Sequence, residues 1–233
     1  PVDVNTADLF RCNVPNLSAT PCFVINDTFY SDGQLEASLP AGVYVGSIAG
    51  FAERHPEQAA RYYGQAAHTN HDAIAALNTL FAQDGLVVYV PAGVALEQPV
   101  QLINLFRSTE RLMANRRILF VVEDGASAKL LVCDHSMGDT DFLSTEVIEI
   151  FAGRDAVVDY YDLEESSIRT RRFSSLFVEQ EAGSNVLVNG ITLNNGQTRN
   201  NYRARINGEH AELTLCGMAI EDREQRVDTY SHI

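Results

Sequence analysis

The sequence predicts an all-β protein, a right-handed parallel β-helix (a single-stranded solenoid) with a short helical segment before it. After residue 84 a unit of strand, turn and strand recurs, with turn glycines 32, 28, 30 and 25 residues apart, at Gly93, Gly125, Gly153, Gly183 and Gly208. Such spacing is typical of solenoids, propellers and arrays. Each unit carries two or three short strands and no helix, whereas a propeller blade needs about 40 residues and four strands. A double-sheet jelly roll, which would need hairpins in place of coils, is the competing architecture.

Composition limits the function classes. The 233 residues are 45% apolar and carry a formal net charge of −14, which argues against nucleic acid as a partner because such binding depends on Lys and Arg. No apolar run is long enough to cross a membrane, and no signal peptide is apparent. The four cysteines form no Cys-x-x-Cys pair. A cytoplasmic location is therefore expected.

The first part of the chain leads into the core. Residues 1–21 have little periodicity and predict an extended arm. Residues 22–83 predict two strands and a helical hairpin. The first strand runs from Cys22 to Tyr30 with an interruption at Asn26-Asp27, and the second runs from Leu39 to Ile48 after a Pro-Ala-Gly turn.

Two helices are expected between these strands and the core. Pro56 suits the first turn of one helix. Asn70 or Asp72 can cap the other, and Gly85 can close it. In that helix the apolar residues fall three or four apart on one face, at Ile74, Leu77, Leu80 and Phe81. His68 and His71 lie near its start, but no acidic or cysteine partner nearby completes a metal site.

The core is expected over residues 84–233 and is expected to be truncated at its C-terminal end, because the chain begins without methionine and ends within a predicted strand. Its first coil is predicted as strand Leu86 to Val90, a Pro91-Ala92-Gly93 corner and strand Val94 to Leu102. Further tight corners are expected at four dipeptides that tolerate positive backbone angles, Asp124-Gly125, Asn189-Gly190, Asn195-Gly196 and Asn207-Gly208.

The clusters of charged residues are interpreted first as parts of the solvent-exposed surface. The carboxylates that could form an acid/base pair or a calcium site are Asp155, Asp159, Asp162, Glu164 and Glu165. On a strand, Asp155 and Asp159 would share a face and Asp162 would point the other way. Acidic surface is the simpler interpretation. The basic clusters, Arg116-Arg117 and Arg169 to Arg172, are likewise expected at solvated strand edges.

No catalytic or cofactor-binding residue is assigned. Cys133 and His135 lie two apart on one predicted strand face and are weak candidate metal ligands, because one thiol and one imidazole cannot fill a tetrahedral site. Cys216 is a third weak candidate. Each is also explained by packing.

Several long segments carry a family resemblance. Leu77 to Leu102 resembles the opening of the β-helix core of the SufB/SufD proteins of iron–sulfur cluster assembly, and further matches begin at Glu123, Val147 and Gly208. Together they cover roughly residues 22–233. Residues 130–139, LLVCDHSMGD, are similar to the SufD branch of this family. Two positions depart from the usual pattern, His210 after the turn glycine and Cys216 before Gly217.

The resemblance implies a non-catalytic scaffold subunit of the SUF complex. It implies a SufB-like sister subunit and a SufC-like ABC-type ATPase docked through a C-terminal region beyond residue 233. No cofactor is expected in this fragment, because the full complex would handle the iron–sulfur cluster transiently. A second copy of the chain is a further expected partner, with the homodimer formed through the open last coil. The alternative function is a β-helix polysaccharide lyase or hydrolase that uses clustered carboxylates.

Overall fold

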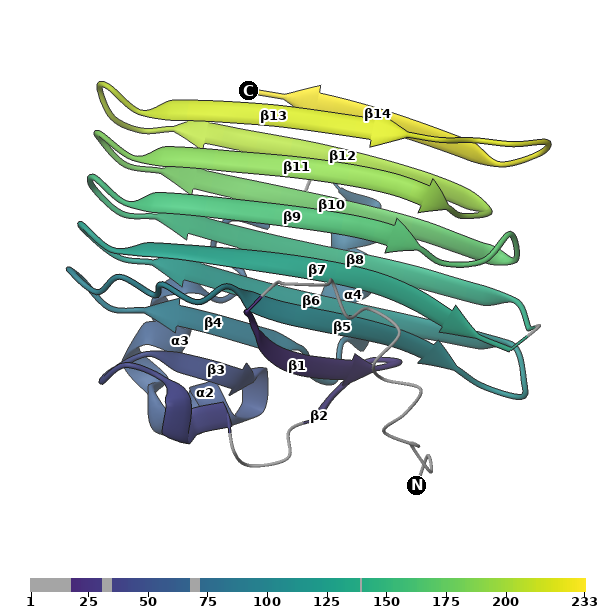
Figure 1. Ribbon diagram of the computed structural model, residues 1–233, viewed down its shortest axis with the longest axis horizontal. Helices are drawn as coiled ribbons and strands as arrows, with labels where there is room; N and C mark the ends of the chain where they lie inside the picture. Colours follow the sequence, from purple (N-terminus) through teal and green to yellow (C-terminus); the bar gives the residue numbers. More distant parts are fainter. Residues whose placement is uncertain (1–17, 31–34, 68–71, 139) are drawn as a thin grey trace.

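A computed structural model describes residues 18–30, 35–67, 72–138 and 140–233. Two seven-stranded sheets lie face to face and are stacked into a solenoid (Figure 1). Sheet A contains β2 (Thr28–Tyr30), β1 (Thr20–Ile25), β5 (Val100–Arg107), β7 (Ser127–Met137), β9 (Val157–Glu165), β11 (Asn185–Asn194) and β13 (Glu212–Ala219). Sheet B contains β3 (Tyr44–Ser47), β4 (Leu86–Val90), β6 (Leu112–Val122), β8 (Phe142–Ala152), β10 (Thr170–Gln180), β12 (Gln197–Ile206) and β14 (Arg226–His232).

Successive coils pair in parallel. From β4 onward each coil contributes one strand to sheet B and one to sheet A, so each strand from β6 to β12 pairs with the strands two places before and after it in the chain. Thus β8 pairs in parallel with β6 and with β10. The parallel β-helix predicted from the sequence is confirmed, and the jelly roll is wrong because its hairpins would give antiparallel neighbours. The strands of 7 to 11 residues from β5 onward are longer than the short strands expected.

The corners between sheet B and sheet A stack one above another. The positive-φ residues at these corners are Gly93, Gly125, Asp155, Gly183 and His210. In two coils the sequence predicts the corner at Gly153 and at Gly208. The residues with left-handed backbone angles there are Asp155 and His210, two positions later in each case. Asn189-Gly190, also predicted as a corner, lies inside β11 instead.

The residues before the core extend both sheets. β1 pairs in parallel with β5, and β2 folds back on β1 at Asn26 and Asp27, where the sequence predicts only an interruption of one strand. β3 pairs antiparallel with β4. The predicted second strand of the first coil begins only at Val100, because residues 94–99 form the corner apart from one isolated bridge at Ala95.

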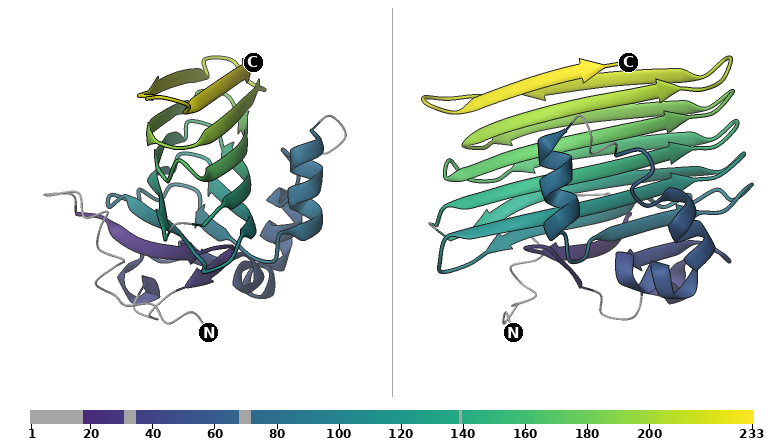
Figure 2. Two further views of the ribbon diagram at one scale, coloured as in Figure 1. Left: turned by 90° about the vertical axis from the view of Figure 1, so that its right-hand side faces the viewer. Right: turned by 180° about the vertical axis from the view of Figure 1, so that it is seen from behind.

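Helices cover the outer face of sheet B, as both views in Figure 2 show. They are the α-helices α2 (Ile48–Arg54), α3 (Pro56–Tyr62) and α4 (Ala73–Phe81), whereas the 3₁₀ helix η2 (Leu35–Ser38) packs Leu35 against the core between the sheets. Pro56 begins α3 and Asp72 caps α4, as predicted, whereas α2 was not predicted. His68, Asn70 and His71 lie outside the described residues, as does most of the expected arm.

The buried face of α4 differs from the apolar face predicted for it. Ala75 and Asn78 are its buried residues, while Leu80 and Phe81 are exposed. The Asn78 amide donates hydrogen bonds to the Arg116 and Thr145 carbonyls at 2.9 and 3.2 Å, so a polar anchor sets the helix orientation. Gly85 does not close α4. A Cβ at Gly85 would lie 2.1 Å from the Arg117 carbonyl oxygen, so this glycine allows a close approach of two backbones.

The core fills the space between the two sheets, here called the lumen. Alternate residues of each strand point into it, as in Leu130 and Val132 of β7 or Ile148 and Ile150 of β8. These apolar residues fill the half of the lumen next to the corners between sheet B and sheet A. Among the described residues, no helix is long and apolar enough to cross a membrane.

Candidate functional site

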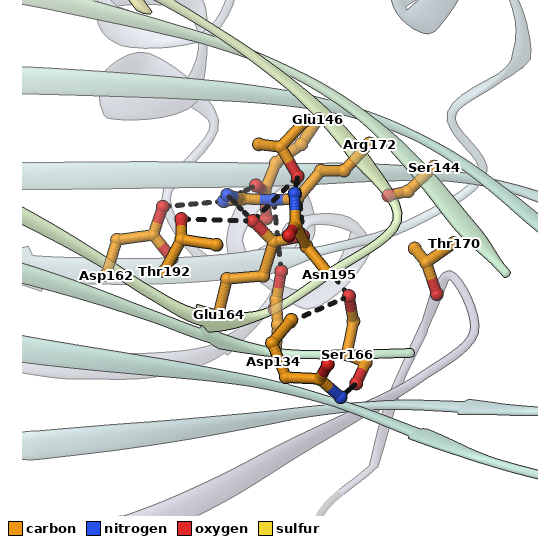
Figure 3. A network of polar contacts seen from close by, with 12 residues as sticks. Asp134, Ser144, Glu146, Asp162, Glu164, Ser166, Thr170, Arg172, Thr192 and Asn195 are labelled. Atoms are coloured by element: carbon orange, nitrogen blue, oxygen red, sulfur yellow. Dashed lines mark hydrogen bonds and ion pairs between the residues drawn. The ribbon is translucent and has the colours of Figure 1, made fainter. Parts of the chain in front are cut away.

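The other half of the lumen is polar. Where sheet A strands end and sheet B strands begin, the inward alternation continues with charged side chains instead of apolar ones. In β7 the inward series is Leu130, Val132 and Asp134, and in β9 it ends in Asp162 and Glu164. In sheet B, Arg116, Glu146 and Arg172 point inward near the strand starts. Figure 3 shows most of this lumen network.

Arg116 and Asp134 form the first pair of the lumen network. The Arg116 guanidinium donates to both carboxylate oxygens of Asp134 at 2.9 Å and also to the Ser144 hydroxyl at 3.2 Å. The Asn104 amide donates to Asp134 Oδ1 at 2.7 Å, and the Arg116 guanidinium lies 4.3 Å from the centre of the Phe106 ring. A bidentate Arg–carboxylate pair is among the strongest charge-assisted contacts, and both partners here are buried.

Arg172 lies at the centre of the lumen network. Its Nη2 donates to Glu146 Oε2 at 2.7 Å and to Asp162 Oδ2 at 2.6 Å, and its Nε lies 3.1 Å from Asp134 Oδ2 (Figure 3). Glu164 is 3.7 Å from Nη1. One guanidinium from β10 therefore joins carboxylates from β7, β8 and β9, so three coils share a single buried cation.

Hydroxyl groups hold Glu164 in place. The Thr198 hydroxyl donates to its carboxylate at 2.9 Å, and the Ser166 and Thr192 hydroxyls lie 3.2 and 3.3 Å from it. Burial nevertheless raises the pKa of Glu164, and this outweighs the opposing effect of Arg172.

The charges of the lumen network do not balance. It contains four carboxylates and two guanidiniums, so full ionisation would leave two uncompensated negative charges. Burial raises the pKa of Asp162 to about 7, with Glu146 and Asp134 adding to the effect. Burial alone would also raise the pKa of Asp134, but Arg116 and Arg172 lower it below its usual value. The network can therefore hold a proton, with Asp162 as the favoured carrier.

A second buried ion pair lies on the outer face of sheet B. Arg117 Nη2 is 2.9 Å from Glu149 Oε2, and its guanidinium lies 4.5 Å from the centre of the Tyr63 ring. Glu149 also accepts the backbone N–H groups of Gly64, Ala66 and Ala67. This carboxylate fixes the segment after α3 to β8.

The structure divides the five carboxylates that the sequence singled out. Asp155 occupies a corner, Asp159 points outward and lies 3.0 Å from Lys129 Nζ, and Glu165 is exposed. Asp162 and Glu164 are buried in the lumen, so their interpretation as acidic surface is wrong. The prediction that Asp162 and Asp159 point to opposite sides is correct.

The basic clusters divide in the same way. Arg116, Arg117 and Arg172 are at most 2% exposed, so their prediction as solvated strand edges is wrong, whereas Arg169 and Arg171 are exposed. Burial is possible because each buried guanidinium meets a carboxylate from a neighbouring coil or the opposite sheet, a pairing that depends on coil register. One signal in the sequence does point to it. On a strand, a residue two positions from an inward-pointing apolar residue also points inward. This rule places Asp134 on the same inner face as Val132, and Arg116 on the same inner face as Ile118.

The weak metal candidates do not come together. Cys133 and His135 do share the outer face of β7, where Cys133 is fully buried beside Ile103 and His135 Nδ1 lies 3.8 Å from Glu165 Oε2. Cys216 is exposed on β13, three strands away in the same sheet, or about 14 Å at the usual strand spacing. Among the described residues, no group of three or more His, Cys, Asp or Glu side chains is arranged to hold a metal ion.

The chain resembles known proteins along its whole length. A family model described as the SufBD protein N-terminal region matches residues 1–102. A second, described as the SUF system FeS cluster assembly SufBD core domain, matches residues 105–233. The division between the two matches therefore falls near β5, later than the expected boundary at residue 84.

Individual relatives agree with these matches. Protein ABCI7, chloroplastic, of Arabidopsis thaliana is 26% identical over 222 residues, which cover 90% of this chain and 46% of the relative. The iron–sulfur cluster assembly SufBD family protein slr0076 of Synechocystis sp. is 24% identical over 241 residues, covering 100% of this chain and 52% of the relative. The protein slr0074 of the same organism is 33% identical over 121 residues, covering 51% of this chain and 25% of the relative.

The chain thus spans about half the length of the first of these curated relatives. The core match alone covers more than half of the chain and coincides with the stacked coils from β5 to β14. The chain belongs to the SufBD family of iron–sulfur cluster assembly proteins.

Proposed function

We propose that this chain is the β-helix part of a non-catalytic scaffold subunit of a SUF iron–sulfur cluster assembly complex. The observation that carries this proposal is the match of the SufBD core domain to residues 105–233, which contain the coils of the solenoid from β6 to β14. Within the family the SufD branch is preferred, because residues 130–139 resemble it. The cluster is cargo of the whole complex in this proposal, and the complex works in the cytoplasm.

The proposed partners are a SufB-like β-helix protein and an ABC-type ATPase. ATP hydrolysis belongs to the ATPase. A non-catalytic role agrees with the lumen of this chain, where the buried charged groups form ion pairs with one another. Arg116 and Arg172 each contact carboxylates of the same chain, so they serve the stack rather than an external nucleotide.

Co-purification tests this proposal. The full-length protein that contains this chain is expressed with the SufB-like and ATPase proteins of the same organism, and an affinity tag is placed on one subunit at a time. A stable complex that contains all three proteins is expected with each tag. Full-length protein that binds neither of the other two would contradict the scaffold function.

No observation in the described residues favours the alternative function, cleavage of a polysaccharide. It needs a pair of accessible carboxylates, and two of the five candidates, Asp162 and Glu164, are buried against Arg172. Asp159 is bound to Lys129 on the outer face. Incubation of the purified protein with uronate polymers and calcium is therefore expected to release no unsaturated product that absorbs at the ultraviolet wavelengths used for lyases.

A further inference from the structure

A groove of about 720 Å³ runs along one edge of the solenoid, across three coils and as far as Gln197 of a fourth. It lies outside the polar half of the lumen, where sheet A strands turn into sheet B strands, at the starts of β6, β8 and β10. Its lining residues follow the coil repeat, because Met113, Leu143 and Arg171 are successive partners in the register of sheet B. The groove therefore runs along the stacking direction, and one coil follows the next at the usual strand spacing of about 4.8 Å.

The lining of this edge groove includes apolar side chains, several of which are exposed. Ile168 is 72% exposed and Met113 is 38% exposed, and Leu143 and Phe142 also line the groove. Apolar side chains that gather on an exposed surface often mark an interaction site. Here they form a strip along the stack.

The charged residues that line the edge groove are mostly positive. Arg111 and Arg169 each place Nε close to one carboxylate oxygen of Asp141, at 3.1 and 3.0 Å. Arg171 is exposed, and its guanidinium has no hydrogen-bond or ion-pair partner within the described parts of the chain. Three arginines against one aspartate give the lining a charge of +2, on a chain whose formal net charge is −14.

The adjoining groove has the opposite sign. It shares Ile168 and Gln197 with the first groove and continues along the same edge. Its charged lining residues are Glu221, Asp222, Arg223 and Glu224, which sum to −2. A long polyanion lying along the edge would therefore be repelled beyond the third coil, so the positive surface suits a short anionic segment.

We propose that the edge groove binds a short, extended acidic peptide segment of a partner protein, with its apolar side chains on Met113 and Ile168 and its carboxylates on Arg171 and Arg111. Charge complementarity carries the choice of partner, since this positive surface lies on a strongly acidic molecule. Arginine suits the role because its guanidinium binds a carboxylate through two parallel hydrogen bonds. This binding site is independent of the scaffold function proposed above.

Fluorescence polarisation of labelled peptides tests the proposal on the chain as it stands. The probes are a fluorescein-labelled hexapeptide of alternating acidic and apolar residues, Glu-Leu-Glu-Ile-Glu-Leu, and a neutral counterpart in which Gln replaces every Glu. We expect the acidic peptide to bind at least about tenfold more tightly than the neutral one. The difference should shrink when salt rises from about 50 to 200 mM, because screening weakens exposed ion pairs.

Variants locate the binding. Arg171→Glu is expected to weaken binding of the acidic peptide at least tenfold. Arg154→Glu is the matched control and should change it by less than twofold, because Arg154 is an exposed arginine at the opposite edge of the stack. Circular dichroism verifies that both variants are folded. Equal effects of the two variants, or no binding of the acidic peptide at about 1 mM, would overturn the proposal.

Two other occupants are distinguished by the same samples. A second copy of the chain in the groove would appear in light scattering as a salt-sensitive dimer that Arg171→Glu abolishes, and this result would overturn the peptide assignment. A small carboxylate as the true ligand would appear in calorimetry as Arg171-dependent binding of citrate at least as tight as that of the peptide. That outcome would also overturn it.

Discussion

Asp162 shows how burial inside a solenoid changes the pKa of an acidic residue. Its carboxylate lies 2.6 Å from Arg172, yet burial raises its pKa to about 7 because Arg172 must also serve Glu146 and Asp134. One cation that contacts four carboxylates cannot compensate the desolvation of all of them. At neutral pH, Asp162 therefore alternates between a charged partner of Arg172 and a neutral hydrogen-bonding group.

The first prediction concerns pH. The folded protein keeps the Asp162 proton up to about pH 7, whereas an unfolded chain loses it near pH 4. Between these values the folded state binds more protons, so this residue makes the free energy of unfolding fall as pH rises. Asp162→Asn removes that proton exchange and should flatten the slope of urea-derived stability between about pH 4 and 7. An unchanged slope would show that another group is responsible.

The second prediction concerns Arg172. Arg172→Ala removes the cation that contacts four buried carboxylates and should lower the free energy of unfolding by about 3–5 kcal/mol at pH 7.5. The loss should be smaller at pH 5, where the carboxylates left without Arg172 can take up protons. Arg154→Ala removes an exposed surface arginine and should cost less than about 1 kcal/mol. Chemical denaturation of both variants at the two pH values measures these differences.

At the scale of elements, one buried carboxylate holds the end of the α3 segment against sheet B. Glu149 of β8 accepts three backbone N–H groups after α3 and pairs with Arg117 of β6. Backbone groups that are buried without a partner are costly. The segment after α3, residues 64–67, is therefore held to sheet B by the Glu149 carboxylate, while α3 itself also contacts Glu123 and Phe151 through Tyr62.

The third prediction follows from this anchor. Glu149→Ala leaves those N–H groups and Arg117 without their acceptor, so hydrogen exchange at Gly64, Ala66 and Ala67 should accelerate at least tenfold. Amides in the centre of β9, in the opposite sheet, should keep their protection. The matched control is Glu181→Ala, which removes an exposed glutamate at a corner of the stack and should leave the exchange at residues 64–67 unchanged. Uniform acceleration across the protein would indicate global destabilisation instead of local release.

At the scale of the whole molecule, stability comes from stacking each coil on its neighbours. A coil in the middle of such a stack has a partner on both sides, whereas a terminal coil has one. Leu130 of β7 is fully buried between β5 and β9, and Leu213 lies on the edge strand β13, where it is partly buried. The same residue type therefore has different surroundings along the stack.

The fourth prediction compares these two leucines. Leu130→Ala should lower the free energy of unfolding by about 2–5 kcal/mol, because it leaves a cavity inside the stack. Leu213→Ala should cost less than half as much, because its site is already partly open to water. Urea denaturation of the two variants checks the difference. Equal losses would mean that the last coil is as tightly packed as the middle ones.

Much of this molecule can be predicted from its sequence. The strands, the coil repeat, the start of α3 at Pro56 and the Asp72 cap of α4 depend on local chemistry: strand alternation, turn residues and capping. The family resemblance is also carried by contiguous segments. Two corners lie at Asp155 and His210, two residues after the glycines that predict them, because Asp and His also accept the positive backbone angle that glycine usually supplies.

Only the tertiary structure decides where the charges lie. Arg116, Arg172, Asp162 and Glu164 have the residue types of a solvated surface, and strand alternation alone fixes only their common side. Their burial depends on which coil supplies the opposite charge at hydrogen-bond distance, and that depends on the register between strands about 30 residues apart. The sequence by itself therefore determined the solenoid and its family. The buried ionic half of the lumen and the positive groove at the solenoid edge follow from the stacking of coils, because their contacts are made between distant residues.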